Sequence, residues 1–183
     1  MTSQAPSPGE NPARFYGKYQ GTVLINIDPL QTGRIIAQVP DVLGETPSSW
    51  ALPCVPGAGA QCGMFIVPPV GAQVWMEFQQ GDPTKPIWTG GFWGMVAQVP
   101  AMATAPPPIP PGQNIVLQTP GQTTLVLSDS APTPATGGIM LKDPSGAMLV
   151  INETGIYIDN GQGASITLIG PTVTVNMGAL VVT

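Results

Sequence analysis

The sequence predicts an all-β protein with an N-terminal Greek-key barrel and a C-terminal β-helical segment. Residues 15–97 contain short extended runs separated by close turns, without the 3.6-residue periodicity of helices. Residues 114–183 repeat a strand–turn–strand pattern, which is typical of stacked β architectures. Residues 98–113 separate the two parts. Residues 1–14, rich in Pro, Ser, Gln and Gly, are expected to form a flexible arm.

The barrel begins with two predicted strands joined by a turn. Residues 19–27 (YQGTVLINI) are rich in β-branched side chains, residues 28–33 hold Asp, Pro and Gly, and residues 34–39 (RIIAQV) return. Two prolines and a glycine predict a loop over residues 40–49. About five short strands within some 80 residues fit a small barrel such as an OB-fold. The remaining short runs and loop are residues 50–55, 57–61 and 63–67.

A hairpin in residues 69–94 (PVGAQVWMEFQQGDPTKPIWTGGFWG) is expected to close this barrel. Val74, Met76 and Phe78 alternate with Gln, Trp and Glu, so the first strand presents two different faces. Residues 80–83 (QGDP) supply the turn, because Gly tolerates positive φ, Asp bonds its own backbone and Pro fixes φ. Three of the four Trp residues lie in this hairpin.

The segment at residues 98–113 (QVPAMATAPPPIPPGQ) contains six prolines. Proline removes backbone donors and favours extended polyproline geometry. The composition predicts a semi-rigid linker between the two domains.

The C-terminal region reads as three strand–turn–strand units followed by a last extended run. Turns are predicted at residues 119–122, 143–146 and 159–163. No charged side chain occurs in residues 160–183, and an isolated sheet of such strands would expose unprotected edges and aggregate. Alternation of aliphatic residues with Thr favours ordered strands over a disordered tail. We therefore expect these strands to pair with other copies of the same chain.

Charge and composition exclude several function classes. The chain of 183 residues has a net charge of −5, no His and only five Lys and Arg, which is a poor match for the phosphates of nucleic acid. Charged residues are 8% of the chain, so much of its surface is expected to face other protein. No apolar run is long enough for a transmembrane helix, and the N-terminus lacks a secretory signal pattern, which predicts synthesis in the cytoplasm. Two buried thiols are favoured over a disulfide for Cys54 and Cys62.

No catalytic, cofactor or metal site is predicted. The absence of His excludes Ser-His-Asp and Cys-His arrangements, and two Cys without His make a zinc site improbable. The acidic residues are scattered and stand mostly in turns, where capping explains them better than glycoside hydrolysis does. The four Trp residues suit either a barrel core or a subunit interface, and a stacking platform for single-stranded nucleic acid would need more cationic side chains.

The residues quoted above resemble the central spike proteins of contractile injection machines. The resemblance is carried by FYGKYQGTVLINIDPLQTGRIIAQVPDVLG, by SSWALPCVP, by VPPVGAQVWMEFQQGDPTKPIWTGGFWG and by TPGQTTLVLSD and KDPSGAMLVINETGIYI. It covers roughly residues 16–157 and points to the phage baseplate assembly protein V type and the valine-glycine repeat spike of type VI secretion. It implies an OB-fold followed by an intertwined trimeric β-helix, or β-prism.

The chain departs from that family in ways that refine the expectation. The lysozyme domain of some phage spikes has no counterpart here, since only the proline segment occupies its place. The apical iron site of some short spikes needs His pairs, which this chain lacks. The resemblance further implies a separate tip protein on the C-terminal end, and baseplate hub and tube proteins at the barrel end.

The sequence thus predicts a non-enzymatic homotrimeric needle, incorporated in the baseplate of a virion-like or injection particle, that pierces a target-cell envelope when a sheath contracts. Its strands would be hydrogen-bonded to neighbouring chains around an apolar axis. The alternative hypothesis is an OB-fold module that binds nucleic acid or oligosaccharide and carries a disordered tail. The residues expected in the trimer core are Ile139, Leu141, Leu149, Ile151, Ile156, Ile158, Ile166, Leu168, Val173 and Val175.

Overall fold

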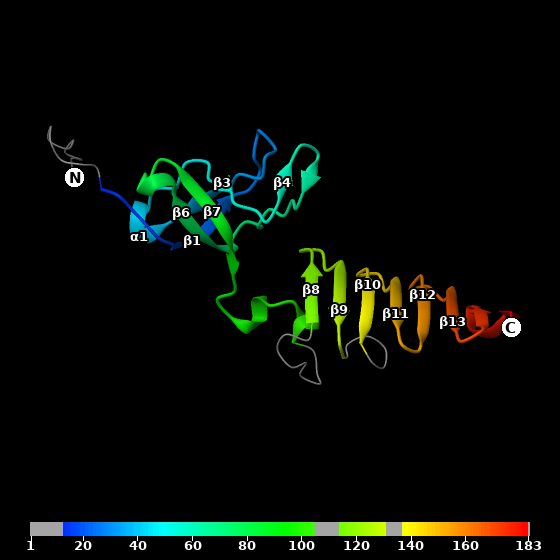
Figure 1. Ribbon diagram of the computed structural model, residues 1–183. Helices are drawn as coiled ribbons and strands as arrows, with labels where there is room; N and C mark the ends of the chain where they lie inside the picture. Colours follow the sequence, from blue (N-terminus) through cyan, green and yellow to red (C-terminus); the bar gives the residue numbers. More distant parts are fainter. Residues whose placement is uncertain (1–12, 105–113, 131–136, 183) are drawn as a thin grey trace, which may run out of the picture. The chain divides into compact units, whose positions relative to one another are not determined.

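The computed structural model describes residues 13–104, 114–130 and 137–182. The chain divides into two compact units, one ending at Gly94 and the other beginning at Met95 (Figure 1). Residues 1–12 of the predicted arm and residues 105–113 of the predicted proline linker lie outside the described residues. Within the linker, the described part contains the short 3-10 helix η3 (Ala101–Ala103), preceded by η2 (Val96–Gln98).

The N-terminal unit is a small barrel whose main sheet has the order β2-β1-β6-β7-β3. The strand β3 runs parallel to β7, and the other neighbours are antiparallel. A separate two-stranded hairpin, β4–β5, lies in the connection between β3 and β6 (Figure 1). The strands are β1 (Tyr19–Ile25), β2 (Ile36–Gln38), β3 (Leu52–Pro53), β4 (Ala58–Gly59), β5 (Cys62–Gly63), β6 (Gln73–Phe78) and β7 (Pro86–Phe92).

The period-two prediction for the closing hairpin is confirmed. Val74, Met76 and Phe78 of β6 are buried, and the residues between them are half-buried. These side chains meet Trp88 of β7 in the barrel core, because antiparallel pairing places alternate residues of both strands on one face. The core is completed by Val23, Ile35, Ala37, Val39 and Ala51.

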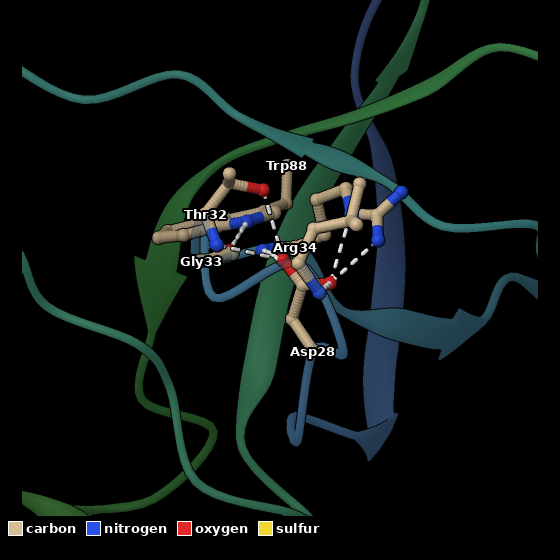
Figure 2. A network of polar contacts seen from close by, with 6 residues as sticks. Asp28, Thr32, Gly33, Arg34 and Trp88 are labelled. Atoms are coloured by element: carbon tan, nitrogen blue, oxygen red, sulfur yellow. Dashed lines mark hydrogen bonds and ion pairs between the residues drawn. The ribbon is translucent and has the colours of Figure 1, made fainter.

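The turn between β1 and β2 is held by one buried carboxylate. Asp28 accepts hydrogen bonds from the main-chain N–H of Leu30 and Thr32, both 2.9 Å, and from the Thr32 hydroxyl, 2.8 Å (Figure 2). Arg34 donates to the same carboxylate through Nε at 3.0 Å and Nη2 at 2.6 Å. The indole N–H of Trp88 donates to the carbonyl of Gly33, 3.0 Å, so this turn is tied to the core strand β7.

The Arg34 guanidinium beside Asp28 holds the pKa of that carboxyl well below its usual range, and the hydrogen bonds from Leu30 and Thr32 act in the same direction. Burial opposes the shift. A carboxylate that accepts several hydrogen bonds keeps its charge because each donor stabilises the ionised form. The ion pair therefore favours the folded state wherever Asp28 is ionised.

Regular structure occurs in two loops predicted for this unit: α1 in residues 40–49 and β4 in residues 57–61. The predicted loop at residues 40–49 holds α1 (Pro40–Leu43), because Pro40 supplies the φ of a first helical residue and Asp41 favours the helix start. Gly44, with a φ of 60°, ends the helix. The prediction that both thiols are buried is wrong: Cys54, in the chain that follows β3, and Cys62, in β5, are exposed and unpaired.

The C-terminal unit is an eight-stranded sheet in which every strand pairs with its neighbour in sequence (Figure 1). All pairs are antiparallel. The sequence predicts strands hydrogen-bonded to other chains, whereas in the structure the ladder forms within one chain. The strands are β8 (Asn114–Gln118), β9 (Thr124–Ser128), β10 (Gly138–Lys142), β11 (Met148–Asn152), β12 (Gly155–Asp159), β13 (Ser165–Ile169), β14 (Thr172–Val175) and β15 (Leu180–Val182).

Turns of one design recur along one edge of this sheet, as the repeat predicted. The main-chain N–H of Thr119, Asp143 and Asn160 donates to the carbonyl four residues later in each case. A side-chain oxygen of the first turn residue accepts a further main-chain hydrogen bond in all of them. The last turn instead contains η4 (Asn176–Gly178). This common geometry keeps the strands equal in length and in register.

We predict that Asp28→Asn lowers the thermal stability of the barrel at pH 7, because it leaves Arg34 without its partner charge. Asp28 has a lowered pKa in the folded state, so its contribution is fully present above about pH 4, the unfolded value, and is lost as the pH falls through the folded value. Thermal unfolding from pH 7 to pH 3 should show the difference from the unmutated protein shrinking in acid. The exposed Glu45→Gln is the control for charge removal, and equal melting temperatures of Asp28→Asn and the unmutated protein at pH 7 would contradict the assignment.

Candidate interface on the C-terminal sheet

The register of the C-terminal sheet aligns aliphatic side chains into two continuous columns on one face. In each antiparallel pair, residues directly opposite each other share a face, so a repeated register extends the column across the sheet. Each of the eight strands supplies one aliphatic residue to each column. The first column is Ile115, Leu127, Ile139, Ile151, Ile156, Leu168, Val173 and Val182, and the second is Leu117, Leu125, Leu141, Leu149, Ile158, Ile166, Val175 and Leu180.

This surface, the aliphatic face, is only partly covered within one chain. Ile139 and Ile166 are 41% and 39% exposed, and Ile115 is 59% exposed. The remaining members are exposed or half-buried. All residues predicted from the sequence for a trimer core lie on this face, together with β8, β9 and β15 residues that the prediction missed. The members in β8 and β9 could have been predicted, since the sequences NIVLQ and TLVLS show the same alternation as the strands that were included.

The opposite face of the sheet differs between its two halves. Near the beginning, Val126, Met140 and Val150 are buried, and Met102 of η3 packs against this cluster. Toward the C-terminal end of the sheet, the same row of opposed residues continues with Thr167 of β13 and Thr174 of β14, and both are half-buried. Lys142 and Asp159 also project on this second face, because they are an even number of residues from Met140 and Tyr157. Within the described strands of this sheet, charge is therefore confined to the face that lacks the columns.

Two family models match this chain. Residues 19–93 match the type VI secretion system/phage-baseplate injector OB domain, and residues 114–181 match the phage baseplate V C-terminal trimerisation domain. The second match spans β8 to the middle of β15, the region that carries the aliphatic face. No curated protein matches the chain.

The chain belongs to the phage baseplate V family. The resemblance read from the sequence is thereby confirmed, and so are the all-β class and the N-terminal OB domain. Members of this family have a structural role in the baseplate spike.

The barrel of this baseplate V protein has little free positive charge among the described residues. Arg34 is paired with Asp28, and Lys18 is paired with Glu77. The Arg34 guanidinium also lies 5.1 Å from the Trp50 ring centre. Single-stranded nucleic acid binding needs a basic groove beside exposed aromatic rings, and these pairings remove two of the five cationic side chains.

The Trp residues of this baseplate V protein occupy different environments. Trp88 is buried in the barrel core, and Trp75 stacks on Phe92 with ring centres 4.7 Å apart. Trp93 is 62% exposed. The prediction of core residues is thus confirmed for Trp88, and Trp93 remains open to a partner.

Two further carboxylates of the described residues have a pKa below the usual range. Hydrogen bonds from Thr84 lower the pKa of Asp82, and hydrogen bonds from Ser145 lower the pKa of Asp143. A general acid requires the opposite shift, so these carboxylates cap turns. No set of three His, Cys, Asp or Glu residues comes together as a metal site in ranges 13–104, 114–130 and 137–182. Over the same ranges, no helix has the length and apolarity to cross a membrane.

We predict that this baseplate V protein does not retain single-stranded DNA. At physiological salt, a fluorescently labelled oligonucleotide should show no anisotropy change at protein concentrations up to about 100 µM, the weak end of non-specific binding. Binding in the low micromolar range that weakens steeply with salt would contradict this prediction and favour the OB-fold binding module.

Proposed function

We propose that this chain is the central spike of the baseplate of a contractile injection machine. In this proposal three copies assemble with their aliphatic faces toward a common axis, and the resulting needle pierces a target-cell envelope when the sheath contracts. The observation that carries the proposal is the pair of uninterrupted aliphatic columns in a region that matches a trimerisation domain.

The columns suit a threefold arrangement in which each chain supplies one wall. Since strands pair within the chain, each layer would hold two aliphatic side chains from each of three chains. Burying an aliphatic side chain of this size is worth about 1.5–3 kcal/mol, and the columns repeat that gain in each of the eight strands. We assign the predicted core residues, from Ile139 to Val175, to this axis, and we add Ile115, Leu117, Leu125, Leu127, Leu180 and Val182.

The sheet geometry suits a needle that bears load. Eight strands spaced about 4.8 Å apart span about 34 Å along the ladder. The strands lie across that direction, so pulling one away requires breaking the hydrogen bonds of both of its neighbours together. The Val173–Val175 layer uses smaller side chains than the Ile156–Ile158 layer. Smaller core residues toward the C-terminal end would let the three walls approach more closely and taper the needle.

Both ends of the spike offer sites for other baseplate components. We propose that the barrel end docks on the hub and tube proteins of the baseplate. At the other end, β15 is an edge strand with exposed Leu180 and Val182 and no charged or proline residue to protect it. An unprotected edge of this kind supports the proposal of a separate tip protein that covers it.

We propose that the chain is not an enzyme. The lowered pKa of Asp82 and Asp143 and the pairing of Asp28 with Arg34 support a structural use of the acidic residues. The work of the spike is then mechanical, and the energy for piercing comes from the contracting sheath.

We predict that Ile166→Asp prevents trimer formation, whereas Thr167→Asp leaves it intact. These residues are adjacent in β13 but face opposite sides of the sheet. A carboxylate at residue 166 would place three unpaired charges in one apolar layer, and each buried, unpaired charge costs several kcal/mol. Sedimentation equilibrium of the full chain measures the outcome. If Ile166→Asp remained a trimer and Thr167→Asp dissociated, the face that contains Thr167, and not the aliphatic face, would lie at the trimer axis.

We predict that particles assembled with Ile166→Asp lack a central spike at the baseplate and fail to permeabilise target cells. The measurement is electron microscopy of purified particles together with release of a cytoplasmic marker from the target. Particles carrying Thr167→Asp are the control and should behave as the unmutated ones. Full permeabilisation by particles without this density would contradict the piercing role.

A further inference from the structure

The barrel unit carries a second apolar surface that the spike axis does not use. Residues 57–70 (GAGAQCGMFIVPPV) contain no charged side chain and form the β4–β5 hairpin and the chain that follows it. Beside them lies the exposed β1–β2 turn (Figure 1). We call this surface the hairpin patch, and its exposed members are Ile27, Leu30, Met64, Phe65, Ile66 and Val70.

Contacts between the two segments make the hairpin patch one continuous surface. The Asn26 side-chain amide donates to the carbonyl of Pro68, 3.1 Å. Phe65 and Gln31 line one hollow together with Gly33. Phe65 is nevertheless 71% exposed and Ile27 83% exposed. Large apolar side chains this accessible and this close together mark a contact surface.

A pocket opens within the patch. Its volume is about 420 Å³, and its walls come from the β4–β5 hairpin, from the end of β3 and from Trp88 of the core. Val55, Met64 and Ile66 supply apolar lining, and Cys62 lies in the same wall. The pocket has room for more than one side chain of a partner, and no charged residue lines it. Apolar side chains from another protein surface suit it best.

We propose that the hairpin patch is a second interface between copies of this chain, in which each barrel packs against the next barrel of the trimer. This inference rests on the proposed trimeric spike. A threefold contact is heterologous, so the patch of one barrel meets a different surface of its neighbour, whose side chains enter the pocket.

The covalent chain explains why the partner is a second copy. Met102, which packs on the C-terminal sheet, is the tenth residue after Phe92, the end of β7. That length of chain spans at most about 36 Å. Trimerisation of the sheets therefore holds three barrels at an effective concentration on the order of millimolar. At that concentration an uncharged apolar surface finds its neighbouring copy before it meets a free protein.

The two cysteines form a built-in reporter of this contact. Cys62 lines the pocket, whereas Cys54 does not, and both are exposed within a single chain. Cys54 sits between two lining residues, Pro53 and Val55, in an extended segment whose alternate side chains point to opposite sides. A partner barrel seated on the patch would shield Cys62 and leave Cys54 reactive.

The test is iodoacetamide labelling of the full-length protein, with both thiols followed by mass spectrometry and the oligomeric state measured on the same sample. In the unmutated trimer, Cys62 should react at least about tenfold more slowly than Cys54, because thiol reactivity requires access. Phe65→Glu, and Ile27→Glu from the other segment, should bring the two rates together while the trimer persists through its sheets. Tyr16→Glu is the control, since Tyr16 is also 71% exposed and lies outside the patch.

The outcomes separate this inference from the proposed function. A trimer in which Cys62 reacts as fast as Cys54 overturns the second interface and leaves the spike intact. Protection of Cys62 only in whole baseplate particles also overturns it, because another component then covers the patch. A monomeric unmutated protein contradicts the trimeric spike itself.

Discussion

The register of the C-terminal sheet is the constraint on which the rest of this structure depends. Side chains alternate between the faces of a strand, so a slip of one residue between two strands would interrupt both aliphatic columns. Turns with the same hydrogen bond at Thr119, Asp143 and Asn160 prevent such slips along one edge. A single chain thus pairs the backbone of neighbouring strands, but it leaves one apolar side-chain face only partly covered and the edges of β8 and β15 unpaired.

Backbone hydrogen bonds are therefore made when one chain folds, whereas the aliphatic side chains are buried when several chains assemble. Hydrogen bonds between consecutive strands form locally within each chain, while the aliphatic face contributes its full stabilisation only when other copies cover it. The uncharged C-terminal end is consistent with this, because charge on the columns would oppose assembly. The cluster of Val126, Met140 and Val150 stabilises the first half of the sheet from its other face. The barrel is stabilised independently, by its own core and by the Asp28–Arg34 pair.

Much of this organisation could be predicted from the sequence. The alternation in residues 73–78 and the repeated turns fixed strand positions well, because both patterns are local. Alternation alone placed all the predicted core residues on one face of the sheet, since each lies in one of the two columns, and their position at a trimer axis stays a prediction. The proposed function rests on a resemblance, which carries information that composition and periodicity do not.

The features that were missed depend on tertiary geometry. Pairing within the chain could not be distinguished from pairing between chains, because both give the same alternation in sequence. The expectation of buried thiols came from the compartment, which says nothing of where the β4–β5 hairpin and the chain before it place Cys62 and Cys54. The ion pair of Asp28 with Arg34 was not predicted, although Asp at the first position of a turn is a common capping residue.

The most direct measurement of the central claim is a cryo-electron microscopy structure of the purified full chain at side-chain resolution. We expect a threefold assembly in which Ile139, Ile151 and the other members of the two columns point toward the axis, with Thr167 and Thr174 facing solvent. A single chain with its columns folded onto its own barrel, or a trimer with Val126, Met140 and Val150 at the axis, would contradict it.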